Sequence, residues 1–200
     1  AIDFGNIGHG AQMRFCSAAS DSTRTFFGGG YTSSTLYDTI EYLTTASTGN
    51  GVDFGNMTGG KNGPAALSSS TRGIFAGGSP AAGWGSDTNV INYITISTTG
   101  NAEDFGDLSV ARSRVQGCSN STRGLVMGGY VYPSASDVID YITTATLGNA
   151  VDFGNLAAAT ERVASAASPT RAIGFAGQTP GGAVNTIQYV EILTTGNAVD

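Results

Sequence analysis

The sequence predicts an all-β protein, a β-propeller of four-stranded antiparallel blades, and the first reason is an internal repeat. The stretch at 148–154 reads GNAVDFG, with near-copies at 49–55, 100–106 and 196–200, and residues 1–5 match the end of another copy. Successive repeated aspartates are 50, 51, 48 and 48 residues apart, which gives about four repeats: they are Asp3, Asp53, Asp104, Asp152 and Asp200. A period of this size is typical of propellers and solenoids.

The second reason is that each repeat contains four short segments with strand character. Small residues form the first segment, as at 116–119 and 164–167. The second is an apolar run that begins at an arginine and is closed by glycine, at 24–28, 72–77, 123–128 and 171–177. The third segments are 39–44, 90–95, 138–143 and 186–192, and a Gly-Asn turn leads into the fourth, which ends at Asp-Phe-Gly.

The third reason is that the third segment is apolar on both faces. Alternation places Ile40 and Tyr42 on one face and Leu43 on the other, and the sister segments repeat this pattern. A sheet buried on both sides must lie between two others, as a propeller blade does. We therefore predict one domain over residues 1–200, with repeats at 6–55, 56–106, 107–154 and 155–200 plus 1–5.

Composition limits the partners. Charged residues make up 12% of the chain, the net charge is -6, and Lys61 is the single lysine. A chain without a basic cluster is a poor ligand for nucleic acid or an anionic membrane. No apolar run approaches the roughly 20 residues that a membrane-spanning helix needs. We expect neither a nucleic-acid partner nor insertion into a membrane.

Opposite charges recur at fixed places in the repeat. Arginine begins each second segment and aspartate lies in each Asp-Phe-Gly, and the predicted clip residues are Arg24, Arg72, Arg123, Arg171, Asp3, Asp53, Asp104 and Asp152. We expect each arginine to bind a carboxylate or a backbone oxygen within or between blades, as a structural clip.

Residues for catalysis or metal binding are scarce. His9 is the only histidine, so a histidine-rich metal site cannot be built. A Ser-His-Asp or Cys-His device would need His9, and nothing near it is a convincing nucleophile, so we expect no enzyme activity, no metal and no cofactor. Glu41, Asp140 and Glu191 lie on repeat strands, where we expect solvated or edge positions. Cys16 and Cys118 fall at nearly equivalent places, which predicts small apolar core positions with free thiols.

The remaining candidates lie in the two variable loops of each repeat. In a propeller, the loop after the fourth strand and the loop after the second strand emerge on one face, which we call the loop face. Aromatic rings beside amides suit contact with sugars or proteins. The predicted ligand residues are Trp84, Tyr130, Tyr132, Tyr31, Tyr37, His9, Lys61 and Asn62. The alternative is that Trp84 and the tyrosines only pack at blade junctions.

The repeat resembles the Kelch and galactose-oxidase-like propeller family. In that family a glycine doublet closes the second strand and an aromatic residue follows on the third; here the doublets are Gly28-Gly29, Gly77-Gly78 and Gly128-Gly129, with Gly177-Gln178 as a degenerate fourth. The later Kelch tryptophan is missing, and the Phe of Asp-Phe-Gly takes its place. The combination S-T-R-G, G-G and G-N-A-x-D-F-G is similar to repeat proteins of marine bacteria and tailed phages, including tail-fibre components.

The resemblance implies a role in virion or surface adhesion. We expect a non-enzymatic structural or adhesive module of a phage virion, tail fibre or other extracellular assembly that recognises a glycan or protein through its loop face. A homo-oligomer or a longer parent chain would fit this setting. The alternative is an intracellular Kelch-type scaffold that holds a protein partner.

Overall fold

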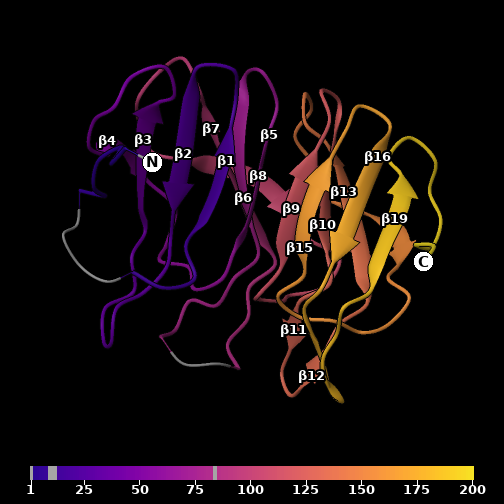
Figure 1. Cartoon of the computed structure of the whole chain (residues 1–200). Coiled ribbons are helices and arrows are strands. Elements are labelled where there is room, and N and C mark those ends of the chain that lie inside the picture. The colour runs from indigo at the N-terminus through magenta and orange to yellow at the C-terminus, as the bar shows by residue number, and fades with distance from the viewer. Residues whose placement is uncertain (1, 9–12, 83–84) are drawn as a thin grey trace.

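The computed structural model describes residues 2–8, 13–82 and 85–200, and within these ranges it contains strands but no helix. Four small antiparallel sheets are arranged as the blades of a four-bladed β-propeller (Figure 1). The first strands of consecutive blades lie side by side along the axis. The predicted all-β propeller class is confirmed.

The blades follow one another along the chain. Blade 1 holds β1 (Ser17–Ser20), β2 (Arg24–Gly28), β3 (Thr39–Thr44) and β4 (Val52–Asn56), and blade 2 holds β5 (Ala65–Ser68), β6 (Arg72–Ala76), β7 (Val90–Thr95) and β8 (Glu103–Asp107). Blade 3 holds β9 (Gln116–Ser119), β10 (Arg123–Met127), β13 (Val138–Thr143) and β14 (Val151–Asn155). Blade 4 holds β15 (Ala164–Ala167), β16 (Arg171–Phe175) and β19 (Ile187–Glu191).

Two further hairpins lie in the loops after the second strands. They pair β11 (Tyr130–Val131) with β12 (Ser134–Ala135), and β17 (Gln178–Thr179) with β18 (Gly182–Ala183).

Most strand bounds agree with the expectation from sequence. The third strands of blades 1 to 3 and the first strands of blades 3 and 4 match residue for residue. Blade 4 departs from the prediction of four full strands, because among the described residues only the bridge between Tyr189 and Val199 stands at the place of its fourth strand. The other fourth strands run one residue beyond Asp-Phe-Gly.

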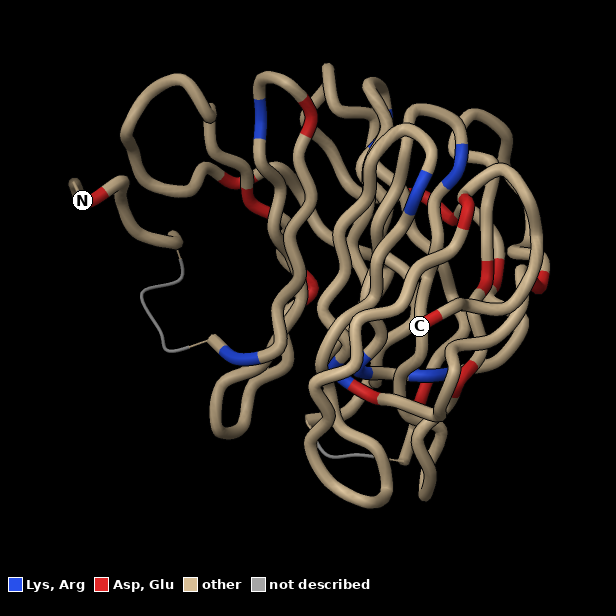
Figure 2. Tube along the Cα trace, turned by 45° about the vertical axis from the view of Figure 1, so that its right-hand side comes forward, with Lys and Arg blue, Asp and Glu red and all other residues tan. Residues whose placement is uncertain are grey.

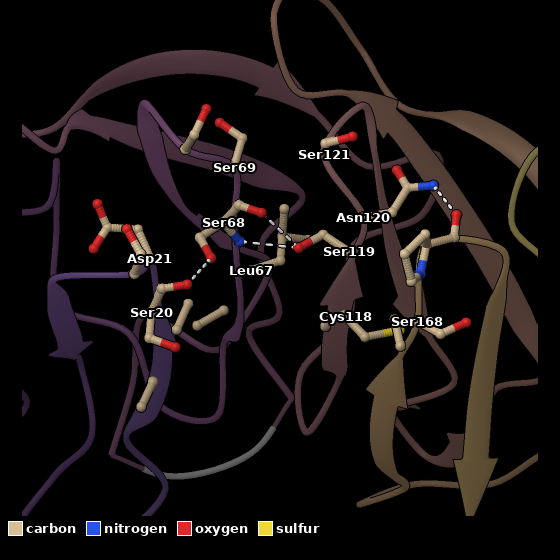
Figure 3. A pocket seen from close by; sticks show the side chains of 18 residues that line it. Ser20, Asp21, Leu67, Ser68, Ser69, Cys118, Ser119, Asn120, Ser121 and Ser168 are labelled. Carbon is tan, nitrogen blue, oxygen red and sulfur yellow. Dashed lines mark hydrogen bonds between the residues drawn. The ribbon is translucent and has the colours of Figure 1, made fainter. Parts of the chain in front are cut away.

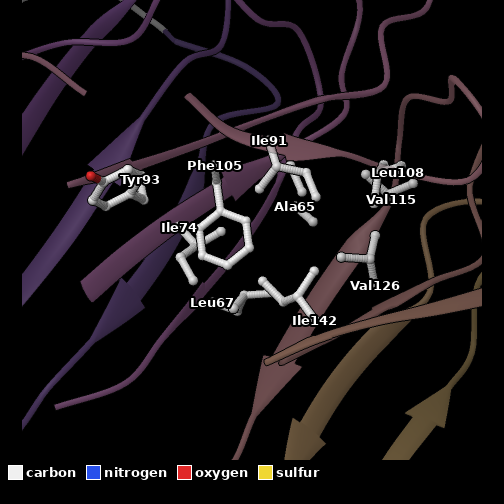
Figure 4. Close-up of a cluster of buried hydrophobic side chains, with 11 residues drawn as sticks. Ala65, Leu67, Ile74, Ile91, Tyr93, Phe105, Leu108, Val115, Val126 and Ile142 are labelled. Carbon is white, nitrogen blue, oxygen red and sulfur yellow. The ribbon is translucent and has the colours of Figure 1, made fainter. Parts of the chain in front are cut away.

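Apolar side chains fill the space between consecutive blades. We call the side of a blade that faces the following blade its forward face, and the opposite side its rear face. Between blades 2 and 3, Ile74 and Ile91 on the forward face of blade 2 form one cluster with Val126 and Ile142 on the rear face of blade 3 (Figure 4). The same arrangement recurs at the other junctions. Burial of both faces of the third strand is therefore confirmed for blades 2 and 3, whereas in blades 1 and 4 one face of this strand is partly or largely exposed.

The repeated Asp-Phe-Gly forms a bulge in the fourth strand. In blade 1 the pairing register shifts between Ile40 and Glu41, which leaves Phe54 as the additional residue. Phe54 is buried, and the Asp53 carboxylate accepts a hydrogen bond from the backbone N–H of Gly55 at 3.1 Å. Gly55 has φ of +145°, and a Cβ there would overlap the carbonyl of Gly100 in blade 2. Only glycine permits this approach of two backbones.

The repeated arginines do not pair with the repeated aspartates among the described residues. Each of the first three instead donates from Nη1 to a backbone carbonyl of the following blade: Arg24 to Ile96 at 2.8 Å, Arg72 to Thr144 at 2.9 Å and Arg123 to Ile192 at 3.1 Å. The pairing register explains this, because arginine stands opposite the end of the third strand and aspartate stands opposite its middle. Arg171 pairs with exposed Glu191.

The polar residues in the middle of the third strands are buried, which corrects the expectation of solvated or edge positions. The four equivalent residues are Glu41, Asn92, Asp140 and Gln188. Each holds the loop that enters its own blade, as when Asp140 accepts bonds from the backbone N–H (3.2 Å) and hydroxyl (2.6 Å) of Ser109. Asp140 also forms an ion pair with fully buried Arg112 at 3.0 Å. Their polar character thus serves loop anchoring.

The two cysteines are free, but their positions differ from the expectation. Cys118 is the third residue of β9 and is buried, and burial raises the pKa of its thiol to about 11. Cys16 is exposed and precedes β1. The loop before β1 is two residues longer than the loop before β9, so counting from the aspartates does not align the two cysteines.

Candidate binding site at the loop face

The two variable loops of each repeat meet on one face, as predicted. Backbone bridges join them at every blade: Arg14 to Tyr31, Asn62 to Ser79, Ser113 to Tyr130, and Glu161 to Gln178. Charged positions are sparse along the trace and form no basic face (Figure 2). The loop face is therefore a polar frame, joined by backbone bridges, with a few cationic and aromatic side chains.

One repeat position on this frame has a left-handed backbone. Its φ is +56° at Phe15, +63° at Gly63, +52° at Arg114 and +56° at Arg162. Glycine adopts this conformation freely, whereas other L-residues lose about 1–2 kcal/mol. Phe15 and the two arginines therefore occupy strained positions. Such strain concentrates at functional sites.

Backbone hydrogen bonds between neighbouring loops hold this position. The N–H of Gly63 donates to the Phe15 carbonyl at 3.0 Å, and the N–H of Arg162 donates to the Arg114 carbonyl at 3.1 Å. All four residues line one cavity of about 360 Å³ at the axis. We call this cavity, with Phe15, Gly63, Arg114 and Arg162 around it, the axial mouth.

Aromatic rings lie against both arginines of the axial mouth. The Arg114 guanidinium lies 4.4 Å from the centre of the Tyr130 ring and forms an ion pair with Glu161. The Arg162 guanidinium lies 5.6 Å from the centre of the Phe15 ring and donates to Gln178 Oε1 at 3.1 Å. Phe15 in turn stacks on Tyr31, with ring centres 6.0 Å apart. Arg162 is exposed, so it can meet a ligand directly.

Three of the predicted ligand residues belong to this region. Tyr31 and Tyr130 carry the stacking contacts just described. Tyr132 is 63% exposed, its ring packs edge-on to Tyr130 at 6.3 Å, and its backbone N–H lies 3.4 Å from Asp87 Oδ2. Tyr37 is half-buried, and its backbone bonds to Gly30 and Lys61. Trp84 and His9 lie outside the described residues.

Lys61 and Asn62 are buried, which corrects their placement among the surface ligand residues. The ammonium of Lys61 donates to the carbonyls of Val90 at 2.7 Å and Gly77 at 3.3 Å. Burial lowers the pKa of Lys61 to about 8, against the opposing charges of Asp104 and Asp107. Lys61 stands at the loop position that Arg112 occupies before blade 3, so a buried cation at this position ties the loop to the sheet.

A second opening lies at the other end of the axis, where the first strands turn into the second (Figure 3). Serine is the commonest residue in the lining of this cavity of about 610 Å³. Its hydroxyls join neighbouring blades, as Ser68 donates to the Ser20 carbonyl at 2.7 Å and Ser119 donates to the Ser68 carbonyl at 2.6 Å. This opening is larger, but its short serine side chains already donate hydrogen bonds to backbone carbonyls of neighbouring blades. The axial mouth is therefore the stronger candidate for a binding site.

Sequence reasoning missed Phe15, Arg114 and Arg162. Three of the four axial-mouth residues, at 63, 114 and 162, stand nine positions after the Phe of Asp-Phe-Gly, and one of them is glycine. That glycine was the available signal, because a repeat position that accepts glycine and arginine indicates a backbone constraint rather than packing.

The described residues contain no cluster of three or more potential metal ligands. They also form no helix that is long and apolar enough to cross a membrane.

Comparison with known proteins found no family model that matches the chain, and no curated protein matches it. The propeller class therefore rests on the strand arrangement, and the likeness to Kelch repeats and phage proteins stays a matter of motif resemblance.

Proposed function

We propose that the protein is a non-enzymatic binding module that recognises a saccharide through the axial mouth. The observation that carries this proposal is that Phe15, Arg114 and Arg162, all with a strained left-handed backbone, surround one cavity. Aromatic rings stack on the apolar faces of sugars, and guanidinium groups donate several hydrogen bonds in a fixed plane. Backbone strain at three equivalent positions lowers stability, and a role of these side chains in ligand binding would explain why the strain is retained.

The engagement of the buried carboxylates supports a binding role over catalysis. Asp140 is held by Arg112 and Ser109, and the Glu41 carboxylate accepts the backbone N–H of Gly8 at 2.8 Å. Hydrolysis of a glycoside needs two carboxyl groups placed on either side of the scissile bond. These two belong to different blades and anchor loops.

We also propose that the module serves in a virion tail fibre or another extracellular adhesive assembly. The motif resemblance to phage repeat proteins and a composition with few charged residues and a single lysine support this setting. The second candidate is a Kelch-type scaffold for a protein partner. The exposed ring of Tyr132 beside Tyr130 favours it, because exposed tyrosine is enriched where proteins meet.

The test is a glycan array followed by calorimetric titration of each hit against variants. Arg162→Gly removes the side chain and relaxes the left-handed backbone, so the fold is retained while the ligand contact is lost. We expect at least a tenfold weaker affinity for Arg162→Gly and no change for Arg171→Ala, which lies on blade 4 away from the mouth. Equal affinity of Arg162→Gly and wild type would place the ligand elsewhere.

Protein binding needs a separate arm. If no glycan binds and a partner protein is captured, Tyr132→Ala distinguishes the second candidate, because its exposed ring should carry that contact. A partner that Tyr132→Ala still binds with full affinity would argue against this face.

A further inference from the structure

Blade 4 exposes apolar side chains whose equivalents are buried in the other three blades. On its forward face Ile173 is 39% exposed and Ile187 is 65% exposed, whereas the equivalent residues of blades 1 to 3 are fully buried. Those buried equivalents are Phe26, Ile74 and Leu125 in the second strands and Ile40, Ile91 and Ile139 in the third strands. The forward face of blade 4 therefore has the exposed apolar side chains that are typical of an interaction surface.

The complementary surface is the rear face of blade 1. Phe27 and Leu43 are half-buried there, whereas their equivalents in blades 2 and 3, Phe75, Ile94, Val126 and Ile142, are almost completely buried against a preceding blade. Forward and rear faces of this repeat pack together three times within the chain. Within the described ranges, the forward face of blade 4 and the rear face of blade 1 are the one forward face and the one rear face that do not pack against another blade in this way.

The segment before blade 1 already occupies the place of a preceding blade's fourth strand. The carbonyls of Phe4 and Asn6 accept hydrogen bonds from the N–H groups of Gly49 and Gly51, both at 2.8 Å. The N–H of Asn6 donates to Asn50 Oδ1 at 3.0 Å. The same contacts join β4 to blade 2, β8 to blade 3 and β14 to blade 4.

Among the described residues, Phe4 has no tyrosine ring against it of the kind that its equivalents have. It is 39% exposed, whereas Phe54, Phe105 and Phe153 are each 3% exposed. Each of those three rings packs edge-on against the tyrosine of its own blade's third strand, with ring centres 5.9 to 6.1 Å apart: Tyr42, Tyr93 and Tyr141. The equivalent tyrosine of blade 4 is Tyr189, and the Arg171 guanidinium lies 4.7 Å from the centre of its ring. In the part of the chain that the structure describes, the strand of Tyr189 has only the bridge to Val199 in place of a fourth strand.

The rear face of blade 1 and the forward face of blade 4 lie apart within one molecule, near the labels N and C in Figure 1. We propose that they meet between two copies of this chain, with blade 4 of one copy docked on the rear face of blade 1 of the next. Residues Phe4–Asn6 of the second copy then extend the edge of β19, and its Phe4 ring packs on Tyr189. Arg171 would reach the carbonyl of Thr45, the equivalent of Ile96.

Such a contact is head-to-tail, so its repetition gives either a closed ring or a filament. This inference stands apart from saccharide binding, since it uses neither the axial mouth nor a ligand.

The first experiment measures mass by light scattering and sedimentation over a hundredfold range of concentration. We expect dimers or larger multiples of the 20.2 kDa chain. Ile187→Asp and Phe4→Ser should each weaken association at least tenfold while the circular dichroism spectrum and melting curve of the dilute protein stay unchanged. Leu147→Asp changes an apolar residue whose exposure, 54%, lies between those of Phe4 and Ile187, and it lies outside the contact, so this variant should associate like wild type. A monomer at every concentration would overturn the proposal.

A cross-link distinguishes contact between copies from closure within one copy. The register of blade 1 pairs Thr39 with Asn56, which makes Thr186 and the second copy's Asn6 direct neighbours. In a Cys16→Ser background, Asn6→Cys and Thr186→Cys proteins mixed together should form a disulfide-linked dimer on oxidation. If the mixed single variants stay unlinked and the double variant cross-links within a monomer, the chain closes on itself and the proposal is wrong.

Discussion

Asn149 in blade 3 accepts a hydrogen bond at its Oδ1 from the backbone N–H of Asp107 in blade 2, over 3.1 Å. The same bond joins Asn6 to Asn50, Asn56 to Asn101 and Asn155 to Asn197. This contact explains why asparagine follows glycine in the most regular stretch of the sequence. The repeated motif is a blade-to-blade fastener, and its parts can be tested separately.

Asn149→Ala should lower the free energy of unfolding by about 1 kcal/mol, because one exposed hydrogen bond between blades is lost. Urea denaturation measures the change. Asn185→Ala, in an exposed loop of blade 4, is the matched control and should be neutral. Equal stability of the two variants would contradict a fastening role for Asn149.

Gly106→Ala should destabilise the protein far more than the same substitution at Gly100, although both glycines belong to one copy of the repeated motif. A Cβ at Gly106, where φ is +144°, would overlap the carbonyl of Gly148, so we expect a loss of about 2–4 kcal/mol. Gly100→Ala is the control, since a Cβ there meets nothing within 4 Å. Thermal unfolding of both variants checks the prediction, and similar melting temperatures would show that the blades can move apart.

Arg123→Ala should lower the free energy of unfolding by about 1–2 kcal/mol. It removes the bond to the Ile192 carbonyl and the stacking on Tyr141, where the guanidinium lies 4.4 Å from the ring centre. Arg171→Ala, whose ion pair with Glu191 is exposed, should melt like wild type when both proteins are dilute enough to be monomeric. An unchanged curve for Arg123→Ala would mean that the junction does not depend on this clip.

Lys61 should make stability rise with pH in the alkaline range. Its pKa falls from 10.5 to about 8 on burial, so between these values the unfolded chain binds more protons than the folded protein. The free energy of unfolding should therefore rise from pH 8 to pH 10.5, by up to about 3 kcal/mol, and be flat for this group outside that window. Urea titrations of wild type and Lys61→Met isolate the effect, and parallel pH profiles would contradict it.

Periodicity predicted the scaffold because the scaffold is what repeats. The glycine doublets, the Ile-x-Tyr alternation of Ile40 and Tyr42, and the Asp-Phe-Gly spacing each report a contact made several times, so strand bounds followed closely. Of the two partners predicted for the repeated arginines, a carboxylate or a backbone oxygen, the structure shows the backbone oxygen for Arg24. Arg24 and Asp53 recur together in the sequence, yet register sends one to a neighbouring carbonyl and the other to its own bulge.

Burial of polar groups was the main error, and its reason is physical. Lys61 and Asp140 were expected at or near the surface because charged residues are seldom buried without partners. Their partners are backbone carbonyls and a buried arginine brought in by loops whose paths carry no periodic signal. The left-handed backbone at Arg114 and Arg162 could not be predicted for the same reason, because the presence of an arginine in a loop does not indicate a positive φ.

The glycine fasteners at the rim and the serine bonds at the axis together fix the curvature of the array. Contact between Gly106 and Gly148 sets how closely the outer edges of two blades approach, and the bond from Ser119 to Ser68 sets the spacing of their inner edges. The ratio of these two spacings defines the wedge angle of each blade. A bulkier residue at the rim would open that angle and a longer one at the axis would close it, so the diameter of any ring made from this repeat is adjustable by two single-residue changes.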